Sequence, residues 1–439
     1  MTICIATDSY YPSVGGIATF YRNQAHSLLA SGHKVIILTV DYNGSATDED
    51  DVQVEGLLTR VYLRRSFHSI YQQLSQYFRP GGLQSYNWMA MGLAMHDWLL
   101  FNHTKLQVDI VEVVDYGGLA YFLCDNQLPP VVITAHGAFT QLQQYNRTPA
   151  DSHARILSEL EMKSFAMADA VIAHSVMNQL ELTELTGRKI ELVTIPWRLG
   201  KGRTTTGAFN NEAVVIGSLA SVKGAIVAAE AVRIARANNR AVQLQWIGPD
   251  SYTAPGAGLM SVYLAANYPD IWNSSFVWKN ALPNEEAIGQ LSSARYVVIP
   301  SLWESFNQVA LEAAAAGKAI IMSDKTGASY LFTHGENCHV VPSGNARALA
   351  AAMEELQNDL QRCSALGARA QQRVEELFSG NGAVEERLNV YREALRERKV
   401  YPPYEERLQL VGRYTRPHRK LYYRLRALLK KIVKGHGAV

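Results

Sequence analysis

The amino-acid sequence predicts an α/β protein with two doubly wound parallel sheets that face each other across a cleft. Short β-rich runs alternate with helical stretches along most of the chain, which is typical of parallel sheets with helices on both faces. The chain has 439 residues and 48% of them are hydrophobic, which is enough for the cores of two or three domains. The small polar stretch 200–207 lies between the two halves and has the composition of a linker.

The predicted strands fall into two groups around this linker. In the first half, β-rich runs occupy residues 2–7, 34–40, 109–114, 131–135, 170–174 and 191–195. In the second half, they occupy residues 213–216, 242–247, 275–278, 296–299, 319–322 and 339–341. We therefore expect an N-terminal domain (1–199), a linker (200–212), a C-terminal domain (213–395) whose last helix crosses back to the N-terminal domain, and a basic tail (396–439).

The region 60–103 lacks a regular strand–helix pattern and mixes arginines with aromatic residues on expected helices. The stems of arginine side chains can pack against aromatic rings, so ordinary packing explains this composition. The alternative is a lobe that faces an acceptor substrate or a membrane.

The most informative stretch covers residues 297–318. Its β-branched run stops at Pro300, which cannot donate to a sheet ladder. Ser305 and Gln308 have the spacing of a capping box, so we expect a helix that begins at Phe306 and ends at a glycine. The sequence therefore predicts a helix N-terminus at the carboxyl edge of the second sheet.

This helix start suggests an anion site. The backbone N–H groups of Phe306, Asn307 and Gln308 would point out of the sheet edge, where anions bind. Glu304 and Glu312 are eight residues apart, which is roughly 12 Å along a helix. That separation exceeds the about 5 to 9.5 Å between the carboxylates of a glycosidase. The two glutamates fit the two ends of a long ligand, such as the sugar and the ribose of a nucleotide-sugar, or else they are solvated side chains on a capped surface helix.

Composition excludes several classes of protein. The formal net charge of +2 gives no global field for nucleic acid. Neither half has a Gly-x-Gly-x-x-Gly sequence after its first strand, which disfavours a nicotinamide dinucleotide. Apart from the acidic run 48–51, no Asp-x-Asp that could form a metal cluster is evident, so no metal is expected. The cysteines lack metal-ligand or disulfide spacing, and we find neither a signal peptide nor an apolar run of about 18 residues, so we expect a cytoplasmic protein.

Three further features lie where a parallel sheet places ligand-binding residues. Gly15 and Gly16 follow the first strand, where glycines let the backbone approach a phosphate. His136 follows strand 131–135, where an imidazole can bond a sugar hydroxyl or move a proton. Lys223 follows the first strand of the second sheet and could neutralise a diphosphate. Each also has a structural explanation, namely a tight turn, a core histidine and a solvated lysine.

Taken together, these residues resemble the retaining GT-B glycosyltransferases of family 4, from Met1 to about Leu395. The most specific likeness is the Glu-x7-Glu spacing of Glu304 and Glu312, with Pro300, Ser301, Ser305 and Phe306 around the first glutamate. The resemblance implies the GT-B fold, a nucleotide-diphosphate sugar as donor, no metal and no other cofactor.

The resemblance also implies roles for single residues. Glu304 would bond hydroxyls of the donor sugar, Glu312 would hold the ribose, and His136 would lie near the reacting carbon. The other donor-binding residues it implies are Gly15, Gly16, Ser218, Lys223, Phe306, Asn307 and Gln308, with Lys223 compensating the diphosphate charge. Ser218 stands where the family usually has arginine, and Asn307 and Cys338 stand where it often has glycine.

The implied reaction is retaining transfer of a hexose or related sugar from a UDP-, GDP- or ADP-linked donor to a glycan, lipid-linked or small-molecule acceptor. No residue stands out as a covalent nucleophile, so front-face attack assisted by the leaving phosphate is expected. Two alternatives stay open: a GT-B phosphorylase or sugar-phosphate synthase, and a catalytically silent subunit that binds a nucleotide-sugar.

The segment 413–434 is basic and carries apolar residues at helical spacing. Such a helix can lie on an anionic membrane surface, with roughly 1 kcal/mol for each basic residue near the surface. This would make the enzyme peripheral on the inner face of the membrane. The alternative is a helix docked on the other domain or a solvated tail.

Overall fold

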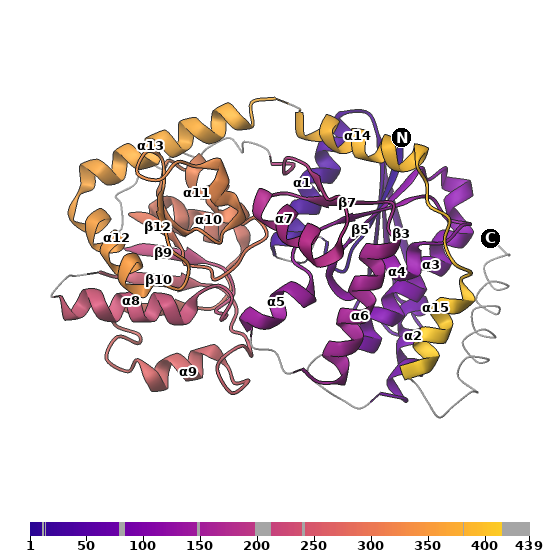
Figure 1. Ribbon diagram of the computed structural model, residues 1–439, viewed down its shortest axis with the longest axis horizontal. Coiled ribbons are helices and arrows are strands. Elements are labelled where there is room, and N and C mark those ends of the chain that lie inside the picture. Colours follow the sequence, from indigo (N-terminus) through magenta and orange to yellow (C-terminus); the bar gives the residue numbers. More distant parts are fainter. Residues whose placement is uncertain are drawn as a thin grey trace.

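The computed structural model describes residues 1–10, 13, 15–78, 84–146, 150–197, 212–238, 242–380 and 382–414. It contains an eight-stranded and a six-stranded sheet, each with helices on both faces (Figure 1). This confirms the predicted class of two doubly wound α/β sheets. The predicted linker lies outside the described residues except for Glu212, and so does the basic tail beyond Tyr414.

The first sheet has the strand order β3-β4-β2-β1-β5-β6-β7-β8, and its strands pair in parallel except for β3 with β4. Its strands are β1 (Thr2–Ala6), β2 (Lys34–Val40), β3 (Asp51–Glu55), β4 (Leu58–Leu63), β5 (Ile110–Val114), β6 (Val131–Thr134), β7 (Ala170–Ala173) and β8 (Glu191–Leu192). Side chains along β1 and β5 are buried on both faces, which gives the continuous apolar runs seen in the sequence.

The second sheet has the order β11-β10-β9-β12-β13-β14, and all of its pairs are parallel. Its strands are β9 (Ala213–Ile216), β10 (Leu244–Ile247), β11 (Phe276–Lys279), β12 (Tyr296–Ile299), β13 (Ala319–Ser323) and β14 (His339–Val341). Every run predicted as a strand in either half therefore overlaps an observed strand.

Helices connect the strands in both domains. In the first domain they are α1 (Gly16–Ala30), α2 (Arg65–Ser75), α3 (Ser85–Leu106), the 3-10 helix η1 (Tyr116–Gly118), α4 (Ala120–Leu123), α5 (Phe139–Asn146), α6 (Ser152–Met167) and α7 (Val176–Thr186). In the second they are α8 (Ala225–Ala237), α9 (Met260–Asn267), α10 (Asn284–Ser293), α11 (Gln308–Ala315), η2 (Gly327–Leu331), α12 (Ala346–Asn358) and α13 (Leu360–Leu377). No helix in the described part of the chain is long and apolar enough to cross a bilayer.

The sequence reading missed the β3–β4 hairpin. Strand β3 is an exposed edge strand, with Val52 and Val54 on the surface, so it lacks the buried alternation that marks a strand. The helices expected in region 60–103 are confirmed. It contains the end of β4, all of α2 and most of α3, and the two helices pack on each other.

Helix α14 (Gly382–Arg396) follows the second domain in sequence but packs on the first, against α1 and β6 (Figure 1). Its buried Arg387 donates to the buried carboxylate of Glu112 in β5 at 2.8 Å. Glu112 also accepts hydrogen bonds from Gln24 at 2.7 Å, from Thr134 at 2.6 Å and from the Tyr391 hydroxyl. The ion pair thus has the extra hydrogen bonds that a buried charge requires.

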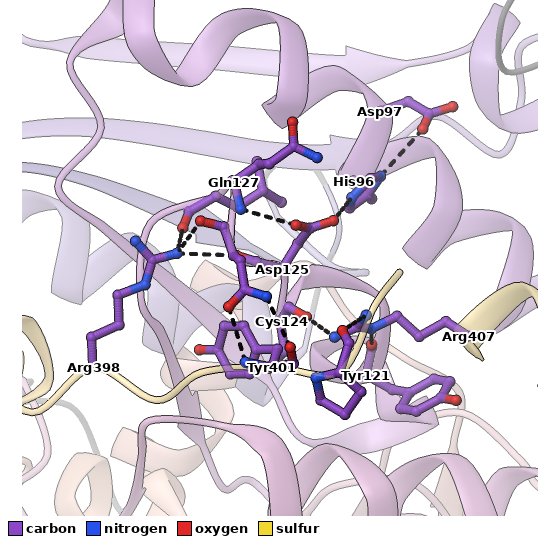
Figure 2. A network of polar contacts seen from close by, with 12 residues as sticks. His96, Asp97, Tyr121, Cys124, Asp125, Gln127, Arg398, Tyr401 and Arg407 are labelled. Atoms are coloured by element: carbon purple, nitrogen blue, oxygen red, sulfur yellow. Dashed lines mark hydrogen bonds and ion pairs between the residues drawn. The ribbon is translucent and has the colours of Figure 1, made fainter. Parts of the chain in front are cut away.

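The chain after α14 stays on the first domain, where it ends in α15 (Glu405–Tyr414). Figure 2 shows the buried Arg407 guanidinium among backbone oxygens: it donates to the carbonyls of Tyr121 at 3.0 Å, Pro402 at 2.9 Å and Cys124. Nearby, His96 lies between Asp97 at 3.3 Å and Asp125 at 3.0 Å. These contacts fix the end of the described chain to the first domain.

Candidate active site

Hydrogen bonds join the carboxyl edges of the two sheets. Ser305, after β12, donates its hydroxyl to the backbone carbonyl of His136, after β6, at 2.7 Å. The Ser305 carbonyl accepts from the Ser175 hydroxyl at 2.6 Å. The Gln308 amide donates to the Gly16 carbonyl at 2.8 Å. The structure therefore brings together the glycine pair, the histidine and the helix start that the sequence singled out.

Helix α11 begins at Gln308, two residues later than predicted, and Ser305 does not cap it. The Ser305 hydroxyl is used in the contact between the domains, and this tertiary bond overrides the local capping-box preference. Asn307 is the residue before the helix. The predicted end is confirmed, because Gly317 has a φ of 67° and its N–H donates to the Ala314 carbonyl at 2.9 Å.

Glu304 is the centre of a polar cluster in the second domain. Its Oε1 accepts hydrogen bonds from the Ser301 hydroxyl at 3.2 Å and from the Asn307 amide at 3.0 Å. It also forms an ion pair with the Nζ of Lys223. Glu304 is only 9% exposed, whereas the Lys223 side chain is 31% exposed. The carboxylate is therefore held in one position, while its lysine partner keeps access to solvent.

Asn307 explains one departure from the family pattern. Its φ of 85° and ψ of 98° are unusual for a residue with a Cβ atom, which accounts for glycine being common at this position. In this chain the asparagine amide reaches Glu304, and its Oδ1 is buried without a partner among the described residues.

The other two positions that depart from the family pattern are Cys338 and Ser218, and they lie in different parts of the second domain. Cys338 is buried directly before β14, where its thiol donates to the Ile320 carbonyl of β13 at 3.3 Å and burial raises its pKa to about 12. Ser218 lies in the loop after β9, close to Gly248, and brings no positive charge to that loop.

Glu312 lies in the second turn of α11 and is half-buried. Burial raises the pKa of its carboxyl group, and the positive charge of Arg22 on α1 partly offsets this effect. Arg22 belongs to the first domain, so its charge acts on Glu312 across the contact between the domains.

His136 lies at the carboxyl end of β6, as predicted. Its ring centre is 4.5 Å from that of Phe20 and 5.2 Å from that of Tyr21. Its Nε2 is buried and has no partner among the described residues. Burial, together with the charge of Arg387, lowers its pKa to about 3. The imidazole is therefore neutral at physiological pH, so it can exchange a hydrogen bond with a hydroxyl but carries no proton to donate as an acid.

The sequence reading missed the carboxylates that hold the His136 loop. Asp115 follows β5 and accepts the N–H groups of His136 and Gly137, both at 3.0 Å. Glu161 on α6 accepts the N–H of Phe139 at 2.8 Å and of Gly117 at 3.0 Å. An acid directly after an apolar strand could have indicated Asp115, whereas Glu161 lies in mid-helix and has no such signal.

Trp303, also missed, joins the two domains. It is 2% exposed and belongs to an apolar cluster made by Ala220 and Val222 of the second domain and Leu142, Tyr145 and Met177 of the first. Its indole N–H donates to Glu181 on α7 at 2.7 Å. The residue before Glu304 is therefore anchored to the first domain. No group of His, Cys, Asp or Glu side chains in the described ranges is arranged to hold a metal ion.

Comparisons with known proteins agree with this geometry. Residues 14–196 match the family described as Glycosyltransferase Family 4, and residues 210–359 match the family described as Glycosyl transferases group 1. Glycogen synthase from Mycobacterium tuberculosis H37Rv is 25% identical over 425 residues, which cover 92% of this chain and 97% of that protein. The capsular polysaccharide biosynthesis glycosyltransferase CapM from Staphylococcus aureus is 33% identical over 100 residues, or 23% of this chain and 26% of that protein.

Solved structures show the same fold. Sucrose-phosphate synthase from Thermosynechococcus elongatus superposes with a TM-score of 0.68 at 19% identity, over 90% of this chain and 99% of that chain. The E. coli trehalose-6-phosphate structure bound with UDP-2-fluoro glucose gives 0.61 at 16% identity, over 92% of this chain and 100% of that chain. With the two family matches, these similarities show that the chain belongs to the GT-B glycosyltransferases of family 4 and is a nucleotide-sugar-dependent transferase.

Proposed function

We propose that this enzyme is a retaining hexosyltransferase that uses no metal. It transfers a hexose or related sugar from a nucleotide-diphosphate donor to a hydroxyl of a glycan, a lipid-linked sugar or a small molecule. The observation that carries the proposal is the cluster of Glu304, Lys223 and Asn307, which lies beside Ser305 and so next to the His136 backbone. It combines a fixed carboxylate for sugar hydroxyls with a cation for phosphate.

In the proposed reaction, the bond between the anomeric carbon and the diphosphate oxygen breaks while the acceptor oxygen attacks the same face of the sugar. The acceptor proton passes to the departing phosphate oxygen, so no protein base is required. Lys223 turns from Glu304 to the diphosphate, and the first turn of α11 adds N–H groups to it. Removing one group that stabilises developing charge typically costs about 3 to 4 kcal/mol.

The remaining residues orient the donor. Glu304, released by Lys223, accepts hydroxyls of the sugar, and Glu312 accepts those of the ribose. The neutral His136 ring bonds a sugar hydroxyl near the reacting carbon. Gly15 and Gly16 let the backbone approach the phosphates, since a Cβ added at either position would meet no atom within 4 Å. Because position 218 is serine, Lys223 must neutralise more of the negative charge of the diphosphate than the lysine does in enzymes that have arginine at position 218.

A donor screen tests this function. Thermal shifts are measured with UDP-, GDP- and ADP-sugars, and transfer is followed by NMR so that the anomeric configuration of donor and product can be compared. Retention with a nucleotide-sugar supports the proposal. Turnover with a sugar 1-phosphate but with no nucleotide-sugar would identify a phosphorylase or synthase instead.

Variants test the assigned cluster and the possibility of a silent subunit. Glu304→Ala and Lys223→Ala are compared with Lys279→Ala, which changes an exposed lysine at the end of β11. Loss of transfer in the first two alone supports the site. Unchanged transfer in folded Glu304→Ala and Lys223→Ala proteins would show that the chemistry lies elsewhere, and nucleotide-sugar binding without turnover in the wild type would indicate a silent subunit.

We also propose that segment 413–434 binds an anionic membrane surface. Of this segment, the structure describes Arg413 and Tyr414, which contact Glu159 on the first domain. Because α15 itself is docked, the truncation that tests the idea ends after Tyr414. The full chain should bind phosphatidylserine vesicles more weakly as salt increases, and the truncated chain should not bind. Equal binding by both proteins would reject the proposal.

A further inference from the structure

One buried carboxylate oxygen at the edge of the first sheet has no hydrogen-bond partner among the described residues. Asp8 follows β1, which lies between β2 and β5, and its Oδ1 is buried without a hydrogen bond in the described structure. Burial raises the pKa of Asp8 to about 6. An unpaired buried polar atom is costly, so its persistence indicates that a ligand supplies the missing donor.

The neighbours of Asp8 come from the adjacent strand ends. Burial, and next the negative charge of Asp8, raises the pKa of Tyr42, after β2. The pKa of Tyr116, after β5, is raised by burial, next by the charge of Glu161 and then by that of Asp8. The two phenol groups therefore lie near the carboxylate, yet neither satisfies its Oδ1. Two aromatic rings from adjacent strand ends therefore lie in the neighbourhood of the carboxylate.

The ring of Tyr116 packs against a second aromatic ring. The Trp88 ring centre lies 5.1 Å from that of Tyr116, and a Cβ added to Gly117 would lie 2.2 Å from the Trp88 indole. Tyr42 keeps 48% of its surface exposed. A few fixed polar atoms beside aromatic faces are the usual composition of a small-molecule site, and the C–H faces of a sugar ring stack on such rings while its hydroxyls reach the polar atoms.

The two arginines of β4 and its end already have acidic partners. Arg60 on β4 pairs with Glu55 at 2.8 Å. Arg64, directly after β4, pairs with Asp41 at 2.8 Å and with Asp51 at 3.8 Å. A phosphate placed beside Asp8 would therefore meet an unpaired carboxylate and arginines that have partners, and like charges at close range repel.

We infer that Asp8 is a specificity-determining residue of the acceptor site: it accepts hydrogen bonds from hydroxyls of an uncharged sugar and disfavours acceptors that carry a phosphate at this position. The inference rests on the proposed function and deepens it by naming the acceptor class. It assigns Asp8 no part in donor binding, which the proposed function gives to residues on α11, on the β9 loop, at His136 and at Gly15 and Gly16.

The test compares acceptors in pairs that differ by a phosphate: glucose with glucose 6-phosphate, and mannose with mannose 6-phosphate. Initial rates are measured with the nucleotide-sugar that the wild-type enzyme hydrolyses fastest without acceptor. We expect the wild type to favour the neutral member of at least one pair by about tenfold or more in kcat/KM. Preference for the phosphorylated member in both pairs would overturn the inference.

Substitutions then assign the preference to Asp8. Asp8→Asn should raise KM for the neutral acceptor about tenfold, the worth of a hydrogen bond to a charged group, and Asp8→Lys should shift the preference toward the phosphorylated member. Donor hydrolysis without acceptor should stay within about twofold in both. The controls are Asp270→Asn and Asp270→Lys, which make the same charge changes on the exposed surface of the second domain.

Failure of the inference and of the proposed function give different results. If Asp8→Asn retains its melting temperature but loses donor hydrolysis and transfer equally, Asp8 acts on the donor and the inference is wrong. If neither Asp8 variant changes the ratio between the paired acceptors, the inference is also wrong, although donor turnover still supports a transferase. If the wild type turns over no nucleotide-sugar, the proposed function fails and the inference fails with it.

Discussion

The two sheet edges that meet at the candidate site are completed in different ways. On the second domain, the Glu304 carboxylate is surrounded by Lys223, Ser301 and Asn307 of its own domain. On the first domain, the buried Oδ1 of Asp8 and the buried Nε2 of His136 have no partner in the described structure. The Glu304 carboxylate is therefore held in place before any ligand binds, whereas Asp8 and His136 lack hydrogen bonds that a ligand can supply.

This difference suggests a division of labour. A preorganised carboxylate lowers the entropic cost of fixing the donor sugar. Unpaired atoms on the opposite edge gain most when a hydroxylated ligand arrives, because they are already desolvated. Ser305 joins the two edges by one hydrogen bond in each direction, so the donor side and the acceptor side are held together.

The largest expected effect comes from breaking the buried ion pair between Arg387 and Glu112 in the first domain. Arg387→Met should lower the free energy of unfolding by about 3 to 5 kcal/mol, because it leaves the buried Glu112 carboxylate without its cation. Urea unfolding measures this change. Arg392→Met on the same helix is the control, since Arg392 pairs with Glu385 on the surface. Equal losses in the two variants would show that the buried pair has no special role.

On the second edge, Glu304→Gln should reduce kcat/KM by about 100-fold to 1,000-fold, equivalent to about 3 to 4 kcal/mol. The amide keeps the shape of the side chain but cannot neutralise Lys223. Steady-state kinetics with saturating acceptor measures the loss, and Glu336→Gln, a change on the exposed surface of the same domain, is the control. A loss of less than tenfold would mean that the preassembled cluster is not the catalytic one.

The pH dependence of stability separates His136 from a second buried histidine. Burial and Arg387 lower the pKa of His136 to about 3, so between about pH 3 and pH 6.5 the unfolded chain binds more protons than the folded one. Stability is therefore lost as pH falls below 6.5, by up to about 1.4 kcal/mol for each pH unit. His136→Gln should make this loss shallower in unfolding curves measured from pH 4.5 to 7.

For His96 we expect the opposite pH dependence of the free energy of unfolding. Burial lowers its pKa, but the hydrogen bonds with Asp125 and Asp97 outweigh this and raise it above the ordinary value. Its stabilisation is therefore present below pH 6.5 and is lost as pH rises through the raised folded pKa. His96→Gln should flatten the curve above pH 6.5. If both variants change the same side of the curve, the neutral state assigned to His136 is wrong.

A smaller effect on kcat/KM is expected from the hydrogen bond that Ser305 makes between the two domains. Ser305→Ala removes the hydrogen bond to the His136 carbonyl and should lower kcat/KM about fivefold to tenfold, the value of one hydrogen bond of about 1 to 1.4 kcal/mol. Ser274→Ala, which changes an exposed serine of the second domain, is the control. Identical rates for Ser305→Ala and wild type would mean that this contact between the domains does not position the site.

The sequence predicted the parts of this arrangement that depend on local pattern. Buried parallel strands such as β2 leave apolar runs, and candidate site residues such as His136 follow directly after such strands. Strand β3 could not be predicted, because its side chains face solvent. The start of α11 was misplaced, because Ser305 bonds the other domain, and the pair of Lys223 with Glu304 depends on how two loops meet in space. Long-range contacts therefore account for the differences.

The smallest effect concerns Asn307, where backbone strain and a side-chain contact oppose each other. A φ of 85° with a ψ of 98° costs a non-glycine residue about 1 to 3 kcal/mol, whereas the amide contact with Glu304 at 3.0 Å returns about 1 kcal/mol or more. Asn307→Gly relieves the strain and loses the contact, so stability should stay equal or rise by less than about 1 kcal/mol. Asn307→Ala loses the contact and keeps the strain, so it should be the least stable of the three in urea unfolding. If Asn307→Ala is as stable as Asn307→Gly, the backbone at this position is unstrained. If kcat/KM is unchanged in Asn307→Gly, Glu304 holds its position without the asparagine amide.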